Sequence, residues 1–158
     1  MKPVKVGICG LGTVGGGTFN VLQRNAEEIA RRAGRAIEVT HIATRAPNPA
    51  CNLGDDVQVY DDALALARHP DIDIIVELIG GYDIALKIVM EAIANGKHVV
   101  TANKALIAVH GNEIFAAARE KGVMVMFEAA VAGGIPIIKS LREGLAANRI
   151  QWVAGIIN

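Results

Sequence analysis

The sequence has few aromatic side chains and no excess charge of either sign. Sixteen lysines and arginines balance sixteen aspartates and glutamates, and aromatic residues make up 4% of the 158 residues. A balanced charge supplies no electrostatic field that would attract nucleic acid or an anionic membrane. We therefore expect neither a nucleic-acid partner nor a membrane partner.

Cysteine and long apolar runs are also scarce. Cys9 and Cys51 lie far apart and match neither a metal-ligand spacing nor a disulfide framework. No stretch approaches the roughly 20 apolar residues that span a bilayer. The apolar Val6–Leu11 run is too short and too rich in glycine for a signal peptide. These absences predict a soluble protein of the cytoplasm.

What the sequence does contain is an alternation of short apolar runs and helix-like spacing. Strands are predicted at Val4–Cys9, Ile37–Ala43, Val57–Tyr60, Ile72–Ile79, His98–Thr101, Val123–Phe127 and Gln151–Ile157. Helices are predicted at Thr13–Ala33, from Asp61 or Asp62 to Arg68, at Tyr82–Ala94, through Ile107 and Gly111–Lys121, and from Pro136 to about Ala147. This order predicts an α/β fold, a Rossmann-type doubly wound parallel sheet in a three-layer αβα arrangement.

A glycine-rich motif directly follows the first predicted strand. Gly10, Leu11, Gly12, Thr13, Val14 and Gly15 have the spacing G-x-G-x-x-G between a strand and a helix. The first glycine permits a tight turn, the second lets a pyrophosphate approach the backbone, and the third lets the helix pack closely on the strand. The N-terminus of the helix adds free N–H groups and the positive end of its dipole. The motif therefore predicts a dinucleotide site, although steric needs alone can also produce such a turn.

The residues that end the second predicted strand favour NADP over NAD. An acidic residue there would bind the ribose 2′-hydroxyl of NAD, whereas an arginine accommodates the 2′-phosphate of NADP. Thr44 and Arg45 directly follow the predicted strand Ile37–Ala43, and the first carboxylate after them is Asp55. Arg45 can pair with a phosphate and Thr44 can donate a hydrogen bond. The alternative is that Arg45 is an ordinary solvated surface residue.

Two further segments should reach the carboxyl edge of the sheet, where open α/β sheets bind ligands. Gly80 and Gly81 would leave room for a cofactor ribose, or would form a turn that needs positive φ. Lys104 can hydrogen-bond a substrate carbonyl and stabilise a developing alkoxide, although a helix cap or a solvated lysine fits the position as well. We expect cofactor contacts from Ile79, Gly80, Gly81, Thr101, Asn103 and Lys104.

The segment Glu128–Pro136 is an unusual strand exit, because it is built from small residues and glycine before a proline. Its backbone carbonyls could face inward together and bind a hard monovalent cation. A simple tight connection is the plainer interpretation of this segment.

Three of these motifs together resemble homoserine dehydrogenases. They are Gly-Leu-Gly-Thr-Val-Gly at 10–15, Thr-Ala-Asn-Lys-Ala-Leu-Ile-Ala at 101–108 and Glu-Ala-Ala-Val-Ala-Gly-Gly-Ile-Pro at 128–136. The closing Gly155–Asn158 also looks like the start of that family's Gly-Ile-x-Asn-Gly-Thr segment. The resemblance covers the whole chain. It implies reversible hydride transfer between NAD(P)H and aspartate 4-semialdehyde, giving homoserine for threonine, methionine and isoleucine biosynthesis.

The resemblance also assigns individual residues. Lys104 matches the lysine between cofactor and substrate, which makes it the candidate catalytic residue. Backbone groups of the strand exit match a sodium site, at Glu128, Val131, Gly133 and Ile135. Ala46 stands where an acidic residue is common in the family, so repulsion of a 2′-phosphate should be weaker here.

By the same resemblance, residues 1–147 form the dinucleotide-binding domain and residues 148–158 begin a truncated substrate and dimerisation domain. We expect this piece to bind NADP, with NAD possible, but to turn over little homoserine. The full-length protein should be a homodimer. Two alternatives stay open: a non-catalytic nicotinamide-nucleotide sensor, and another Rossmann amino-acid or semialdehyde dehydrogenase. A nucleophilic cysteine in a strand exit would favour aldehyde oxidation, and neither cysteine is so placed.

Overall fold

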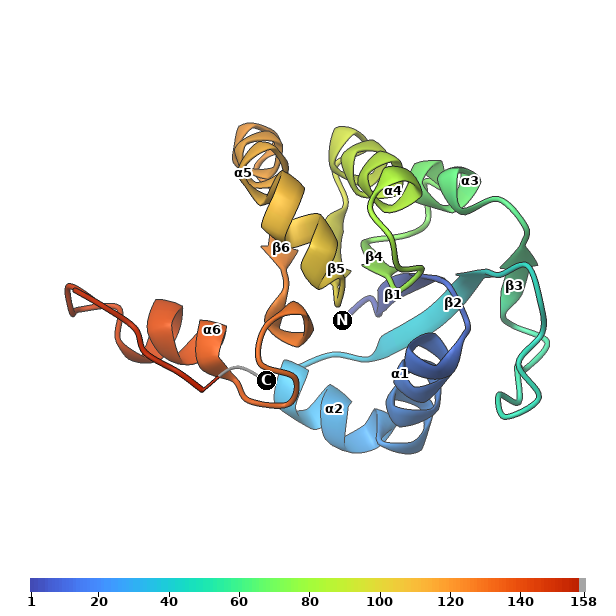
Figure 1. Cartoon of the computed structure of the whole chain (residues 1–158). Helices are drawn as coiled ribbons and strands as arrows, with labels where there is room; N and C mark the ends of the chain where they lie inside the picture. Colours follow the sequence, from blue (N-terminus) through green and yellow to red (C-terminus); the bar gives the residue numbers. More distant parts are fainter. Residues whose placement is uncertain (157–158) are drawn as a thin grey trace.

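The computed structural model describes residues 1–156 and contains one parallel sheet (Figure 1). Its strands are β1 (Val4–Cys9), β2 (Ile37–Ala43), β3 (Gln58–Tyr60), β4 (Ile74–Glu77), β5 (His98–Thr101) and β6 (Val125–Met126). They lie in the order β3-β2-β1-β4-β5-β6, and every neighbouring pair is parallel. The strand order reverses between β1 and β4, which confirms the predicted Rossmann-type doubly wound sheet.

Helices cover both faces of the sheet (Figure 1). The helices are α1 (Thr13–Arg24), α2 (Ala26–Ala33), α3 (Ala63–Arg68), α4 (Asp83–Ala94), α5 (Lys104–Lys121) and the short α6 (Ile137–Lys139). Helices α1 and α2 lie against one face, and α3, α4 and α5 lie against the other. The predicted three-layer arrangement is therefore present. No helix in residues 1–156 is both long enough and apolar enough to cross a membrane.

The two faces of the sheet bury separate apolar clusters. On the α1 side, Ile8 of β1 packs in one cluster with Phe19. On the α4 side, Ile75 of β4 packs in another cluster with Ile88. Strands that are buried on both faces carry continuous rather than alternating apolar residues. This explains why the sequence shows the strands as unbroken apolar runs.

Two helix boundaries differ from the prediction, and a third agrees with it. The single helix expected at 13–33 is divided at Asn25, whose φ of −107° and ψ of 19° are not helical. Gly34 ends α2 in the left-handed conformation, as expected. Helix α5 begins at Lys104, earlier than the predicted region, because the Asn103 side chain caps it by accepting a hydrogen bond from the N–H of Leu106 at 3.1 Å.

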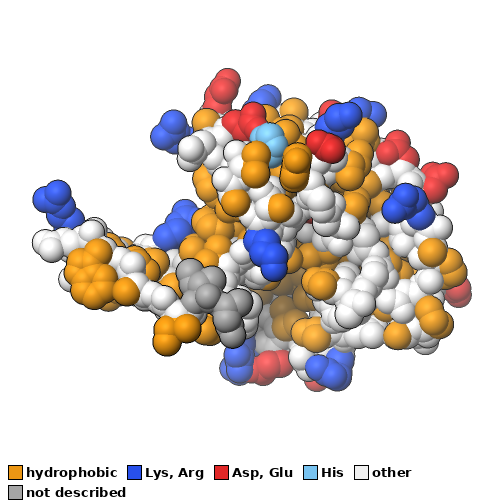
Figure 2. Space-filling view, viewed as in Figure 1, with side chains coloured by type: hydrophobic (Ala, Val, Ile, Leu, Met, Phe, Trp, Pro, Cys, Tyr) orange, Lys and Arg blue, Asp and Glu red, His pale blue; other side chains and the backbone are white. Residues whose placement is uncertain are grey.

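The predicted C-terminal strand is wrong over the described residues. Residues 151–156 form no regular element, and Ile157 and Asn158 lie outside the described residues. A strand is stable only when its backbone groups are paired with a neighbour, and this segment lies apart from the sheet, in the arm that projects beyond β6 (Figure 1). The helix expected at 136–147 is also shorter, since α6 passes into a π-helical turn at Ser140–Gly144. Apolar side chains gather on this projecting segment (Figure 2), and Trp152 is 77% exposed.

A histidine with an unusual environment lies in β2. His41 is buried, and its Nε2 has no hydrogen-bond partner within residues 1–156. Its ring centroid lies 4.2 Å from that of His69. Burial lowers the pKa of His41 below its ordinary value, and the nearby His69, Lys5 and Lys97 lower it further against the opposing effect of Asp71. The folded protein therefore favours the neutral imidazole.

Acidification should destabilise the fold because the unfolded chain binds a proton at His41 more readily than the folded chain does. The ordinary histidine pKa is 6.5 and the folded value lies below it, so stability decreases as the pH falls through 6.5 toward the folded pKa. Urea unfolding at pH 7.5 and at pH 5.5 measures this loss. The loss should be smaller in His41→Phe, which keeps a ring but cannot be protonated, and an equal loss in both proteins would contradict this account.

Candidate functional site

The ends of three strands are tied together where the sheet order reverses. The N–H of Gly10 donates to the carbonyl of Ala43 at 2.8 Å, and the N–H of Leu78 donates to the carbonyl of Cys9 at 2.9 Å. Gly10 has a φ of 96°, and a Cβ on it would lie 2.8 Å from the carbonyl oxygen of Leu78. Only glycine fits this turn without strain. The chain therefore leaves β1 at one fixed angle.

Helix α1 begins against this turn. A Cβ on Gly15 would lie 1.9 Å from the carbonyl oxygen of Gly10, so the third glycine of the motif is required for close packing. Gly12 occupies the N-cap, and the first helical hydrogen bond runs from the N–H of Gly16 to its carbonyl at 2.8 Å. The N–H groups before Gly16, including those of the exposed Thr13 and Val14, have no partner within the helix. They form the predicted anion-binding end of α1.

An asparagine that the sequence motifs do not reveal supports the glycine-rich loop. Asn48, which follows β2, donates from its side-chain amide to the carbonyl of Leu11 at 2.9 Å and to that of Gly12 at 3.3 Å. A Cβ on Gly16 would lie 2.4 Å from the same nitrogen. Because Gly16 has no side chain, the amide of Asn48 can lie close to the start of α1. No sequence spacing connects Asn48 to this loop, because the contact depends on how the loop after β2 folds back.

One hollow lies on the β2 side of the carboxyl edge. It has a volume of about 380 Å³, and its lining includes Thr44, Arg45, Asp61 and Ile79. The hydroxyl of Thr44 donates to the carbonyl of Ala46 at 2.7 Å, so it is engaged locally. Asp61 was not expected here, because it comes well after Arg45 in the sequence and reaches the hollow through β3. Its carboxylate and the Arg45 guanidinium therefore line the same hollow.

A second hollow lies on the β5 side of the same edge. It has a volume of about 420 Å³ and is lined by Val14, Leu78, Ile79, Gly80, Gly81, Ala102, Asn103, Lys104 and Ala105. Gly80 and Gly81 have φ values of 84° and 68°, so they form a turn that requires glycine and also leave the hollow open. Lys104 is exposed as the first residue of α5. Ile79 lines both hollows, which makes them neighbours along one edge.

A buried carboxyl group that the sequence analysis missed lies behind the second hollow. Glu77, the last residue of β4, has no exposed surface. One of its oxygens accepts from the N–H of Ile79 at 2.8 Å, and the other accepts from the hydroxyl of Thr101 at 2.7 Å. Thr101 is itself fully buried, so its side chain lies behind the hollow rather than in it. An acidic residue near the carboxyl end of the apolar run before Gly80 was the signal that could have revealed Glu77.

The buried thiol of Cys9, near Glu77, is unreactive. Burial raises the pKa of Cys9 to about 12, and the nearby Glu77 contributes to the rise. A thiol with such a pKa stays protonated near neutral pH and is a poor nucleophile. Cys9 therefore cannot form the thioester that aldehyde oxidation would need.

The candidate sodium segment is a compact turn at the end of β6. The Glu128 carboxylate accepts from the N–H groups of Ile138 at 2.9 Å and Lys139 at 2.8 Å, so its side chain fixes the start of α6. The backbone carbonyl of Glu128 accepts from the N–H of Val131, and that of Ile135 accepts from the N–H of Ile137. Each carbonyl keeps a second lone pair. The segment is thus compatible with a cation held by carbonyl oxygens, and among residues 1–156 no group of three acidic, histidine or cysteine side chains offers another metal site.

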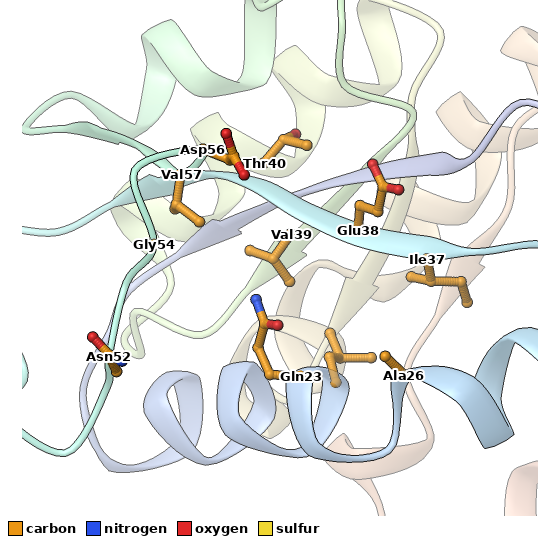
Figure 3. Close-up of a pocket in the computed structure, with 11 residues that line it drawn as sticks. Gln23, Ala26, Ile37, Glu38, Val39, Thr40, Asn52, Gly54, Asp56 and Val57 are labelled. Carbon is orange, nitrogen blue, oxygen red and sulfur yellow. The ribbon is translucent and has the colours of Figure 1, made fainter.

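A further cavity, about 540 Å³, lies elsewhere. It is formed between β2 and helices α1 and α2, beside Ile37, Val39 and Gln23 (Figure 3). Ile37 and Val39 belong to the first half of β2, away from its carboxyl end. Ligands of open α/β sheets bind beyond the carboxyl ends of the strands. The two hollows at that edge, although smaller, are therefore the better cofactor site.

Comparison with known proteins places the chain in a family. A family profile described as "Homoserine dehydrogenase, NAD binding domain" matches residues 10–128. The chain belongs to the homoserine dehydrogenase family. It is 73% identical over all 158 residues to a homoserine dehydrogenase of Pseudomonas aeruginosa, and 55% identical over 158 residues to one of Neisseria gonorrhoeae. In both cases the chain spans 36% of the relative's length.

Solved structures of this family share the fold. The crystal structure of a homoserine dehydrogenase from Thiobacillus denitrificans matches with a TM-score of 0.87 and 64% identity, over 94% of this chain and 35% of that one. A hyperthermophilic archaeal homoserine dehydrogenase in complex with NADPH matches with a TM-score of 0.74 and 26% identity, over 92% of this chain and 50% of that one. The family profile thus assigns this fold to a domain that binds a nicotinamide dinucleotide.

Alanine substitutions at two glycines of α1 should have opposite effects on stability. Gly15→Ala places a methyl group against the Gly10 carbonyl and should lower the free energy of unfolding by more than about 2 kcal/mol. Gly17→Ala meets no atom within 4 Å and should raise it by roughly 0.5–1 kcal/mol. Chemical denaturation measures both values. Equal effects at the two positions would show that the close packing of α1 on the turn is not required.

Proposed function

We propose that this chain is the cofactor-binding part of an NAD(P)-dependent homoserine dehydrogenase that interconverts aspartate 4-semialdehyde and homoserine. The observation that carries the proposal is the pair of hollows that meet at Ile79, with the free N–H groups of α1 beside Val14. An extended dinucleotide fits this edge with its adenosine ribose near Arg45, its pyrophosphate at α1 and its nicotinamide near Gly80. The names and the high identities of the relatives support the same activity.

Lys104 is the residue of this chain that we assign to the chemistry. Lys104 lines the hollow assigned to nicotinamide, where its ammonium group can donate a hydrogen bond to the carbonyl oxygen of the aldehyde. Such a donor stabilises the negative charge that develops on that oxygen. A bound nicotinamide would supply or accept the hydride. A sensor module would not need an exposed lysine here, which favours the enzyme.

The remaining assignments concern the domain limits, the full-length assembly, the location in the cell and the sodium ion. Because the chain spans 36% of its relatives' length, we propose that residues 1–147 are the dinucleotide-binding domain and that residues 148–158 begin the domain that supplies the substrate contacts. Turnover by this chain alone should therefore be low. We also propose a homodimer for the full-length protein, a cytoplasmic location and sodium binding by the backbone of Glu128, Val131, Gly133 and Ile135.

We propose that NADP is preferred over NAD because Arg45 follows the end of β2 and can pair with a 2′-phosphate. The NADPH complex of the archaeal relative supports a 2′-phosphorylated cofactor in this family. Asp61 lines the same hollow and should oppose the preference through repulsion of the phosphate. Asp62 is engaged differently, since its carboxylate accepts from the N–H of Leu64 at the start of α3.

Calorimetric titration of NADPH and NADH tests this assignment. Arg45→Ala should weaken NADPH binding by about 10- to 100-fold through loss of a charge-assisted hydrogen bond, and should change NADH binding little. Asp61→Asn should strengthen NADPH binding and leave NADH binding nearly unchanged. Equal affinity of the parent chain for the two cofactors would refute the NADP preference, and binding of neither would refute the proposed function.

A further inference from the structure

We infer that Glu77 is the positioning residue that holds both walls of the nicotinamide hollow in their binding arrangement, an inference that rests on the proposed function. Glu77 lies at the end of β4, is completely buried and touches no solvent. It is therefore not a ligand contact. Its two oxygens nevertheless reach both loops that line the hollow, one after β4 and one after β5.

The first wall is held through a direct bond. The N–H of Ile79 donates to Glu77 at 2.8 Å, and Ile79 is the residue that lines both hollows. Ile79 leads into Gly80 and Gly81, which have positive φ values and, as glycines, no side chain with which to pack. The bond from Ile79 to the buried Glu77 side chain thus supplies one fixed point for this turn.

The second wall is held through Thr101. Its hydroxyl donates to Glu77 at 2.7 Å and accepts from the N–H of Asn103 at 3.0 Å. Asn103 then caps α5 at Leu106, and its amide also donates to the carbonyl of Gly81. This chain of bonds runs from Glu77 to the start of α5, where Lys104 lies. The bonds also form a closed ring, because the Asn103 amide bonds to Gly81 in the first wall.

The hydrogen-bond directions require two acceptor oxygens at position 77. Glutamine has one acceptor and one donor. If its nitrogen faces Ile79, two donors oppose each other. If its nitrogen faces Thr101, the hydroxyl receives two donors and its own proton loses its acceptor. Glu77→Gln, which keeps the size of the side chain, therefore leaves a buried donor without an acceptor in either orientation, and buried unpaired groups of this kind are costly.

The experiment compares Glu77→Gln with Glu120→Gln, a matched change at an exposed residue of α5. The probes are NADPH and 2′-phospho-ADP-ribose, which has the same adenosine end but no nicotinamide. Glu77→Gln should bind NADPH at least tenfold more weakly, with a smaller change in nicotinamide fluorescence, and should bind 2′-phospho-ADP-ribose within about twofold of the parent. Glu120→Gln should match the parent with both probes.

Two outcomes overturn the inference: unchanged NADPH binding in Glu77→Gln, or an equal loss for both probes, which would indicate general loosening of the fold. If Glu77→Gln does not fold, a second pair decides. Thr101→Val should lose NADPH affinity selectively, and Thr101→Ser, which keeps the hydroxyl, should recover most of it; no recovery would overturn the inference. Failure of the parent to bind either probe would instead refute the proposed function, and the inference with it.

Discussion

The contact between Gly15 and the carbonyl oxygen of Gly10 determines where everything else at the carboxyl edge can lie. Because no side chain fits between them, helix α1 starts directly on the exit of β1 and directs its free N–H groups over the edge of the sheet. Ile79 comes to the same place from β4, and the hollows on its two sides follow from that position. Displacement of α1 would separate the anion-binding end from both hollows.

Polar side chains behind the edge hold the loops that form it. Asn48 fixes the glycine-rich loop, and Glu77 and Asn103 connect the loops after β4 and β5. Loops that are held before a ligand arrives lose less conformational freedom on binding. The site is thus organised in advance, in part by groups such as Glu77 that do not themselves face the ligand. This arrangement also explains why Thr101, expected as a cofactor contact, has no exposed surface.

The sequence predicts well those features that are local or periodic. Four of the six strands of the sheet, the motif at residues 10–15 and a cap at Asp61 or Asp62 all follow from runs, spacing and capping preferences; β4 and β6, with four and two residues, are shorter than the predicted strands Ile72–Ile79 and Val123–Phe127. Features that depend on distant segments are not accessible in this way. Asp61 joins Arg45 only because β3 pairs with β2, and Asn48 reaches Leu11 only because a loop folds back. The predicted strand at 151–157 failed for a related reason, since a strand needs a partner that an apolar pattern does not reveal.

The central claim is that the N-terminus of α1 holds the pyrophosphate of a nicotinamide dinucleotide. A crystal structure of the chain with NADPH tests it most directly. The account predicts pyrophosphate oxygens within hydrogen-bonding distance of the N–H groups of Gly12, Thr13 or Val14, with the nicotinamide beside Gly80 and Lys104. A dinucleotide bound instead in the cavity between β2 and α2, with the glycine-rich loop unoccupied, would contradict it.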